Sequence, residues 1–232
     1  MDLGINAEGR RGPMRVIVLT LLCADVVAYL LLQVWFTAFL RYLSVCLAYC
    51  VSLIALAETQ EKIVPFALLF TLAADWFFVV CDPPVPLAAV SLFLVVQTLY
   101  FVRLNRKRDK KAFFLALSAR TVVFLFLMGV FLQAKIREPL FYIAGVYALM
   151  FAENLAEGIA FERAHPFVFG LAFFLLCDIF VALSYLFQTG RLIPIESLDL
   201  AYSCRVLAWS VYPPSQMLIA LSSFSGSETP LF

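Results

Sequence analysis

Two aspartates lie inside apolar stretches that otherwise suit the interior of a bilayer. Asp75 occurs in "LFTLAADWFFVV" and Asp178 in "LAFFLLCDIFVAL". A charge at the bilayer centre costs at least a few kcal/mol, so each carboxyl should be neutral or paired. Desolvation favours the neutral form, and a second carboxyl nearby favours it further in one of the two. Such a pair could hold one proton and one charge, which general acid/base hydrolysis requires.

The alternative for each aspartate is a purely structural role. In that role the carboxyl hydrogen-bonds a neighbouring Tyr, Gln or Ser and holds two helices together. Asp25 has no counterpart elsewhere in the chain and is interpreted in this way. Other polar residues expected to line a cavity are Gln97 and Tyr100 in "VVQTLYF", and Tyr212, Ser215 and Gln216 in "VYPPSQMLIALSS".

The prolines Pro213 and Pro214 should disturb the last apolar helix and free backbone carbonyls at depth, which is tolerated mainly beside a cavity. The alternative is that this pair only starts the last helix late. Other chemistries find little support: there is no GxSxG or Walker A motif, His165 is the single histidine, and the six cysteines lack CxxC spacing. We expect neither a metal nor an organic cofactor.

The composition predicts an all-α polytopic membrane protein. Hydrophobic residues make up 64% of the chain, charged residues 14%, and the mean hydropathy is +0.96. The polar start lacks a cleavage site, so we expect a short tail and a retained first helix. A span needs about 20 apolar residues. Eight runs qualify, with seven as the competing count: 15–33, 37–57, 63–81, 85–103, 112–132, 139–156, 166–187 and 200–222.

Orientation follows from the Lys and Arg residues, of which "RLNRKRDKK" alone carries six. With eight spans, this loop falls on the side of the N-terminal arginines, so both termini are expected to be cytoplasmic. Glu58, Glu153 and Glu157 then lie near cytoplasmic helix ends and should be solvated. The predicted organisation is a cytoplasmic tail (1–14), an eight-helix transmembrane domain (15–223) and a C-terminal tail (224–232). The net charge of +1 argues against nucleic acid as a partner.

The chain also echoes itself, because the segments around Asp75 and Asp178 share an apolar stretch, a small residue, Asp and then aromatic and aliphatic residues. Four helices separate the two segments, so both cross the membrane in the same direction. We therefore predict a four-plus-four parallel repeat that places the two carboxyls at similar depth. Chance similarity between Leu- and Phe-rich helices is the alternative.

These features resemble the YhhN family of multi-pass proteins, which includes the lysoplasmalogenases, over roughly residues 15–223. The family's "GD" in the third helix corresponds to "AAD" (Asp75), and "SD" in the seventh to "LCD" (Asp178). Its last helix, close to "YYLAQLLIALS", matches "VYPPSQMLIALS", and "AHLLYI" in the fourth matches "VQTLYF". The family's histidine is Gln97 here, and its "KP" at the second helix is at best Arg41 followed by Tyr42.

The resemblance implies a hydrolase that cleaves the vinyl ether bond of lysoplasmalogens, releasing a fatty aldehyde and glycerophosphoethanolamine or glycerophosphocholine, in the cell membrane. It implies Asp75 and Asp178 as acid and base, without a choice between them. Substrate-binding residues would be Gln97, Tyr100, Tyr212 and Gln216, with Arg41 as a phosphate contact. The partners would be a lysophospholipid substrate and membrane lipids. Two alternatives stay open: a non-catalytic lipid-binding protein, and a small proton-coupled transporter that uses the paired acids.

Overall fold

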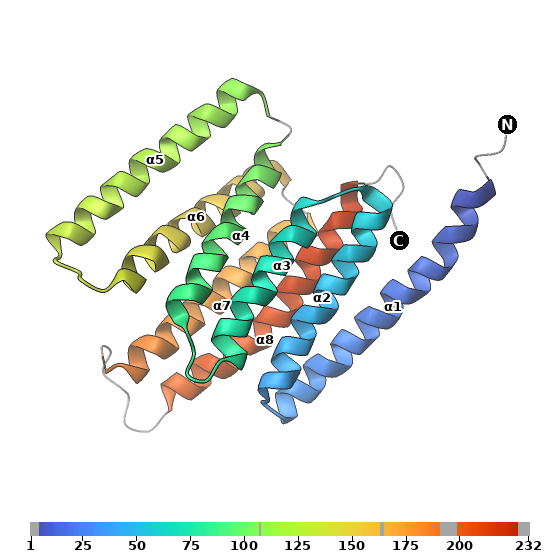
Figure 1. The fold of residues 1–232 in the computed structure, drawn as a ribbon, viewed down its shortest axis with the longest axis horizontal. Helices are drawn as coiled ribbons and strands as arrows, with labels where there is room; N and C mark the ends of the chain where they lie inside the picture. The colour runs from blue at the N-terminus through green and yellow to red at the C-terminus, as the bar shows by residue number, and fades with distance from the viewer. Residues whose placement is uncertain (1–4, 107, 163–164, 191–198, 227–232) are drawn as a thin grey trace. The chain divides into compact units, whose positions relative to one another are not determined.

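The fold is seen in a computed structural model that describes residues 5–106, 108–162, 165–190 and 199–226 (Figure 1). Within these ranges all regular secondary structure is helical. The helices are α1 (Ile5–Val34), α2 (Ala38–Thr59), α3 (Ile63–Asp75), α4 (Pro86–Asn105), α5 (Lys110–Gln133), α6 (Pro139–Glu162), α7 (Pro166–Gln188) and α8 (Leu200–Leu221). A π-helix, η1 (Trp76–Val80), continues α3, and a 3₁₀-helix, η2 (Ser222–Gly226), follows α8.

The eight α-helices lie where the eight apolar runs predict them. Seven of them, α1 to α7 with η1 included in the third, are long and apolar enough to cross a membrane. Helix α8 is equally long at 22 residues, but it contains Arg205, Gln216 and two prolines and falls outside that group. Length and composition therefore support seven spans among the described residues, the lower of the two predicted counts.

Two predicted boundaries differ from the structure. Helix α1 begins at Ile5, within the predicted tail, although its span-forming part begins only at Pro13. Helix α6 runs on to Glu162 instead of ending near residue 156. Parts of the chain used in the sequence analysis lie outside the described residues, namely 1–4, Lys107 and 227–232.

Local sequence signals explain where the helices start. Proline occupies the first position of α4, α6 and α7, where its missing N–H leaves no hydrogen bond unmade. Side-chain oxygens cap three other helices, since Thr37, Asp109 and Asp199 accept hydrogen bonds from backbone N–H groups of α2, α5 and α8. The segment "CDPPVP" forms a tight turn between η1 and α4, in which the Val85 N–H donates to the Phe77 carbonyl at 3.0 Å.

The chain divides into two compact units, which are described separately. The first unit comprises Met1–Pro65 and His165–Phe232, and therefore holds α1, α2, α7 and α8. The second unit comprises Phe66–Ala164 and holds most of α3, together with η1, α4, α5 and α6. Asp178 belongs to the first unit and Asp75 to the second.

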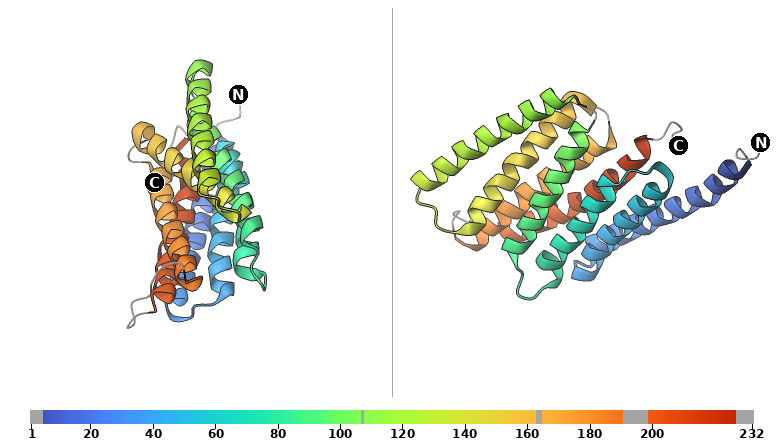
Figure 2. Two further views of the ribbon diagram at one scale, coloured as in Figure 1. Left: turned by 90° about the vertical axis from the view of Figure 1, so that its left-hand side faces the viewer. Right: turned by 45° about the horizontal axis from the view of Figure 1, so that its top comes forward.

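Close contact between α7 and α8 organises the first unit, and the two helices lie side by side (Figure 2). Gly170 makes this approach possible: a Cβ atom there would lie 2.9 Å from the Ser215 carbonyl oxygen and 2.7 Å from Ile219 Cγ1. Further along, Ser184 Oγ donates to the Ala201 carbonyl at 2.9 Å. Small residues at membrane helix interfaces let two backbones meet in this way. The two helices are therefore antiparallel and fixed in register.

Ion pairs link α5 to α6 in the second unit. Arg120 Nε lies 3.5 Å from a Glu153 carboxylate oxygen, and its Nη2 lies 3.3 Å from one of Glu157. Arg108 lies 3.8 Å from Glu157, to which Asn105 Nδ2 also donates at 2.9 Å. The expectation that Glu153 and Glu157 are solvated is therefore wrong, because both carboxylates are paired and largely covered. These pairings also explain why α6 extends past its apolar part. Glu58, by contrast, is exposed as predicted.

Buried polar residues and exposed apolar residues give both units the inside-out pattern of a membrane protein. In the second unit Thr71, Gln97 and Asn154 have no exposed surface, whereas Leu115 and Phe126 of α5 are each 73% exposed. Lipid tails solvate apolar side chains but offer no hydrogen bonds, so polar groups turn inward to find partners. The chain is accordingly a helical membrane protein.

We predict that Gly170→Ala destabilises the protein by about 1–3 kcal/mol, because the added methyl group meets backbone atoms of α8 that cannot rotate away. Unfolding in mixed detergent and SDS micelles would measure this change. Gly129→Ala in α5 is the matched control, since nothing lies within 4 Å of the added Cβ. Equal effects of the two substitutions would contradict the close packing at Gly170.

We predict that Arg120→Ala destabilises the protein by about 3–5 kcal/mol, because it leaves the largely covered Glu153 without its cation and Glu157 with only Arg108 at 3.8 Å. The same micelle unfolding assay applies. The triple variant Arg120→Met, Glu153→Gln, Glu157→Gln should regain much of this loss, since it removes the uncompensated charges. Lys111→Ala, at an exposed lysine of the same helix, is the control. If it lowered the stability as much as Arg120→Ala, loss of the ion pairs would not explain the effect.

Candidate functional site

Asp75 is the last residue of α3 and is 3% exposed. The backbone changes character directly after it, since the Cys81 N–H reaches the Trp76 carbonyl five residues back at 3.0 Å. Such π turns inside helices are rare and frequently occur at functional sites. The carboxyl therefore sits in the covered part of the second unit, at a local distortion of the backbone that the apolar sequence did not predict.

Gln97, on α4 of the same unit, has no exposed surface and is fixed by Asn154 of α6. Asn154 Nδ2 donates to both the backbone carbonyl and the side-chain Oε1 of Gln97, at 2.8 and 2.9 Å. The first of these bonds sets the orientation of the Asn154 amide, and the second then sets that of Gln97. Gln97 Nε2 has no hydrogen-bond partner in the described part of the chain. Tyr100 follows on the same helix and is fully buried.

Asp178 lies on α7 of the first unit and is partly exposed. Phe174, one helical turn earlier on the same face, packs against Tyr212 of α8 with ring centroids 5.5 Å apart. Helices α7 and α8 run antiparallel, with Phe174 opposite Tyr212 and Ser184 opposite Ala201. Asp178 lies between these two contacts and is therefore level with about Ala208 of α8. Tyr212 is therefore about one helical turn from Asp178 along the α7–α8 interface.

Arg41 at the start of α2 is held by two aromatic rings. Its guanidinium carbon lies 4.9 Å from the ring centroid of Phe36 and 5.1 Å from that of Trp209. Trp209 in turn packs edge-on against Tyr212, with centroids 5.2 Å apart. Cation–π contacts fix the position of a guanidinium without neutralising its charge. Arg41 therefore carries its positive charge at a defined place beside Trp209, in the same unit as Asp178 and Tyr212.

Helix α8 continues through both prolines, so the alternative that they start the helix late is wrong. Pro214 cannot donate to the Ser210 carbonyl four residues back, and the hydroxyl of Tyr29 on α1 donates to that carbonyl instead, at 3.1 Å. Beyond the prolines, Ser215 Oγ donates to the Tyr212 carbonyl at 2.6 Å.

Gln216, the next residue of α8, has no exposed surface. Its Nε2 donates to Ser215 Oγ at 3.2 Å. Its Oε1 is without a hydrogen-bond partner among the described residues. A buried amide acceptor is thus left unused beside the prolines, on the same helix as Tyr212.

The predicted site residues thus fall into two groups. Asp75, Gln97 and Tyr100 belong to the second unit, whereas Asp178, Tyr212, Gln216 and Arg41 belong to the first. Each group combines a carboxyl, an amide with an unused hydrogen-bonding atom and a buried tyrosine. Such groups can exchange a proton and can bind a polar headgroup. Asp25 instead accepts a hydrogen bond from Ser44 of α2, in keeping with its expected structural role.

Sequence reasoning missed four residues that hold site side chains or neighbouring helices in place: Tyr29, Arg120, Asn154 and Trp209. Arg120 could have been found, because it is a single cation within an otherwise apolar span. Asn154 is a neutral polar residue between Glu153 and Glu157 near the end of its apolar run, where a polar side chain gives no sign of a buried contact. Tyr29 and Trp209 gave no signal of their own, since aromatic residues are common in apolar membrane helices.

We predict that Tyr29→Phe destabilises the protein by about 1 kcal/mol, because the Ser210 carbonyl loses the donor that replaces the missing proline N–H. Detergent unfolding again provides the measurement. Tyr49→Phe is the matched control: this hydroxyl, on α2, makes no hydrogen bond in the part of the chain that is described. If the two variants were equally stable, the role of Tyr29 as a substitute donor would be refuted.

Comparison with known proteins identifies the relationships of the chain. No curated protein and no solved structure matches it. The model of the YhhN family matches residues 35–223. This range begins just after α1 and includes all seven predicted site residues, so the earlier resemblance is confirmed, although over a slightly shorter range. The chain belongs to the YhhN family.

Proposed function

We propose that the protein is an integral membrane hydrolase that cleaves the vinyl ether bond of lysoplasmalogens. Membership of the YhhN family, which is associated with hydrolase activity and lysoplasmalogenases, is the observation that supports this most strongly. The carboxyl of Asp75, buried in a span and followed by a π turn, adds physical support. An ionisable group at such a place is costly unless it has a function or a partner.

The reaction suits a pair of carboxyls. A neutral carboxyl donates its proton to the vinyl carbon that is not bonded to oxygen, which gives an oxocarbenium ion. A carboxylate then takes a proton from the water molecule that adds to this ion. The resulting hemiacetal breaks down to a fatty aldehyde and the free hydroxyl of the glycerophospho-headgroup. We assign Asp75 and Asp178 jointly to the acid and base roles, and the reaction consumes only water.

The other predicted residues would bind the polar part of the substrate. Gln97 Nε2 and Gln216 Oε1 are a buried donor and a buried acceptor without a partner among the described residues, so each is available to a substrate hydroxyl or phosphate. Tyr100 and Tyr212 would contribute their hydroxyl groups. Arg41, held over Phe36 and Trp209, would attract the phosphate through its unneutralised charge.

One observation favours a second candidate, a non-catalytic lipid-binding protein. Gln97 stands where the family carries a histidine, and its amide is fixed by Asn154. An amide cannot titrate, so this position cannot exchange a proton with substrate. A lipid-binding protein would keep the polar contacts and need no proton transfer.

We predict that purified protein in detergent releases aldehyde from lysoplasmenylethanolamine, and that Asp75→Asn and Asp178→Asn each lower kcat at least about 100-fold. The reason is that asparagine neither donates nor accepts the proton that the reaction moves. Aldehyde formation can be followed with a coupled alcohol dehydrogenase assay, with thermal unfolding as a check that each variant folds.

Asp25→Asn is the matched control, because Asp25 is also a buried aspartate of an apolar helix and asparagine can still accept from Ser44. This variant should keep its activity. If the wild type bound the lipid but released no aldehyde, the lipid-binding candidate would replace the hydrolase. Unchanged release by both site variants would exclude the Asp/Asp mechanism.

A further inference from the structure

Two hollows meet at Arg108 in the second unit, where the polar turn after α4 leads into α5. The first, of about 230 Å³, lies between the end of α4 and the start of α5. The second, of about 540 Å³, lies along α5 and reaches Phe161 of α6. Arg108 lines both hollows, and neither is lined by a residue of the proposed hydrolytic site.

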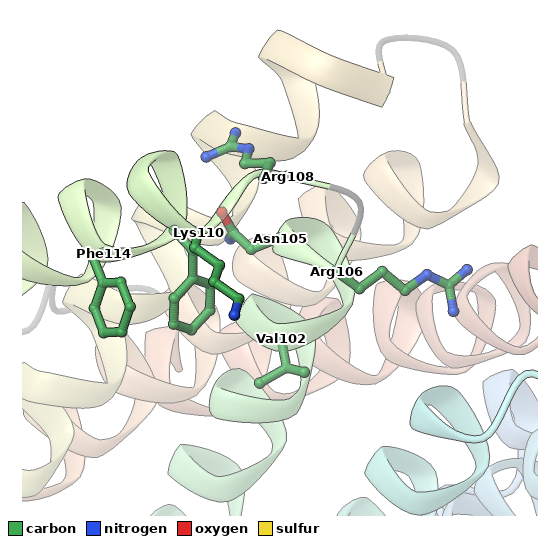
Figure 3. Close-up of a pocket in the computed structure, with 7 residues that line it drawn as sticks. Val102, Asn105, Arg106, Arg108, Lys110 and Phe114 are labelled. Carbon is green, nitrogen blue, oxygen red and sulfur yellow. The ribbon is translucent and has the colours of Figure 1, made fainter.

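The first hollow carries positive charge above an apolar floor. Its cationic residues are Arg106, Arg108 and Lys110, and its apolar ones include Val102 and Phe114. Figure 3 shows Lys110 extending over Val102, while Arg106 and Arg108 project in other directions from the turn. The three cationic residues therefore stand at the rim of the hollow, and Lys110 is the one that reaches across it. Such an arrangement suits an anionic headgroup lying across the rim, with apolar groups below it.

Arg108 is fixed in this arrangement, since its guanidinium carbon lies 3.9 Å from the centroid of the Phe161 ring and its Nη1 lies 3.8 Å from Glu157. Two acids lie nearby: Glu157 is shared between Arg108 and Arg120, and Asp109 accepts a hydrogen bond from the Ala112 N–H as the cap of α5. Asn105, which is 2% exposed, also lines the first hollow. Its Nδ2 donates a hydrogen bond to Glu157, whereas its Oδ1 has no partner among the described residues. The hollow thus offers positive charge together with one buried acceptor.

The second hollow is an apolar groove with small residues on one side. Ala112, Ala116 and Ala119 recur at helical spacing along α5, Leu115 and Phe161 add apolar surface, and Arg108 and Asp109 form the polar end. Helix α5 is otherwise covered with exposed apolar side chains, so the groove opens toward the lipid phase. A groove of about 540 Å³ that is lined mainly by apolar side chains suits one hydrocarbon chain.

We propose that these joined hollows bind an anionic phospholipid of the surrounding membrane. Its phosphate lies against the ammonium group of Lys110, within the positive field of Arg106 and Arg108 at the rim, a headgroup hydroxyl donates to Asn105 Oδ1, and one acyl chain follows the alanines of α5. The lysoplasmalogens of the proposed reaction have zwitterionic headgroups, so this is a separate lipid site, and it does not rest on the proposed function.

Native mass spectrometry of the full chain in neutral detergent can test the proposal. Phosphatidylglycerol should bind at least about tenfold more tightly than phosphatidylcholine with the same acyl chains, since each nearby cation contributes about 1 kcal/mol. The double variant Arg106→Gln, Lys110→Gln should lose most of this preference, and Lys110→Gln alone should lose part of it. Ala116→Phe, which fills the groove, should weaken the binding of phosphatidylglycerol but not the binding of inorganic phosphate. Thermal unfolding confirms that each variant is folded.

Lys111→Gln is the matched control, because Lys111 neighbours Lys110 in sequence, carries the same charge and lines neither hollow. Its phosphatidylglycerol affinity should match that of the wild type. Equal losses in Lys111→Gln and Lys110→Gln would overturn the proposal in favour of diffuse attraction to the basic turn. Inorganic phosphate binding as tightly as phosphatidylglycerol, with no effect of Ala116→Phe, would overturn the assignment of a lipid.

Discussion

Polar groups inside an apolar slab have to find their partners within the protein, because hydrocarbon offers no hydrogen bonds. The described contacts follow this constraint. Asn154 satisfies both oxygens of Gln97, and Ser44 donates to Asp25. The carbonyl that Pro214 leaves without a donor receives the hydroxyl of Tyr29. Every one of these bonds joins two helices, so the same interactions that satisfy the polar groups also decide which helices are neighbours.

The two units use different means to hold their helices. In the first, backbone contact at Gly170 fixes the register of α7 and α8, and this places Asp178 about one turn from Tyr212. In the second, Arg120 ties α5 to two carboxylates of α6, while most of α5 stays open to lipid. Tight packing makes a rigid position for a site residue. Ion pairs in the first half of α5 and ring packing of Phe131 on Tyr142 near its end leave beside the helix the groove into which a lipid chain can fit.

Family membership restricts the possible chemistry, and the residues of this chain determine how that chemistry could proceed. Without a histidine at position 97, proton transfer would fall to the two aspartates, and the amides of Gln97 and Gln216 would bind substrate. The unused Nε2 and Oε1 atoms of these amides fit such a division of roles, because a buried polar atom without a partner is destabilising unless a ligand satisfies it.

The sequence alone determined the helices and most of their limits, because bilayer thickness sets the length of an apolar run and proline marks a helix start. It also singled out Asp75 and Asp178, since a carboxyl in such a run is conspicuous. Only the tertiary structure showed that Arg120 pairs with Glu153 and Glu157, that Trp209 holds Arg41, and that Tyr29 completes α8. These contacts depend on which helices lie side by side and in what register, and hydropathy carries no information about either.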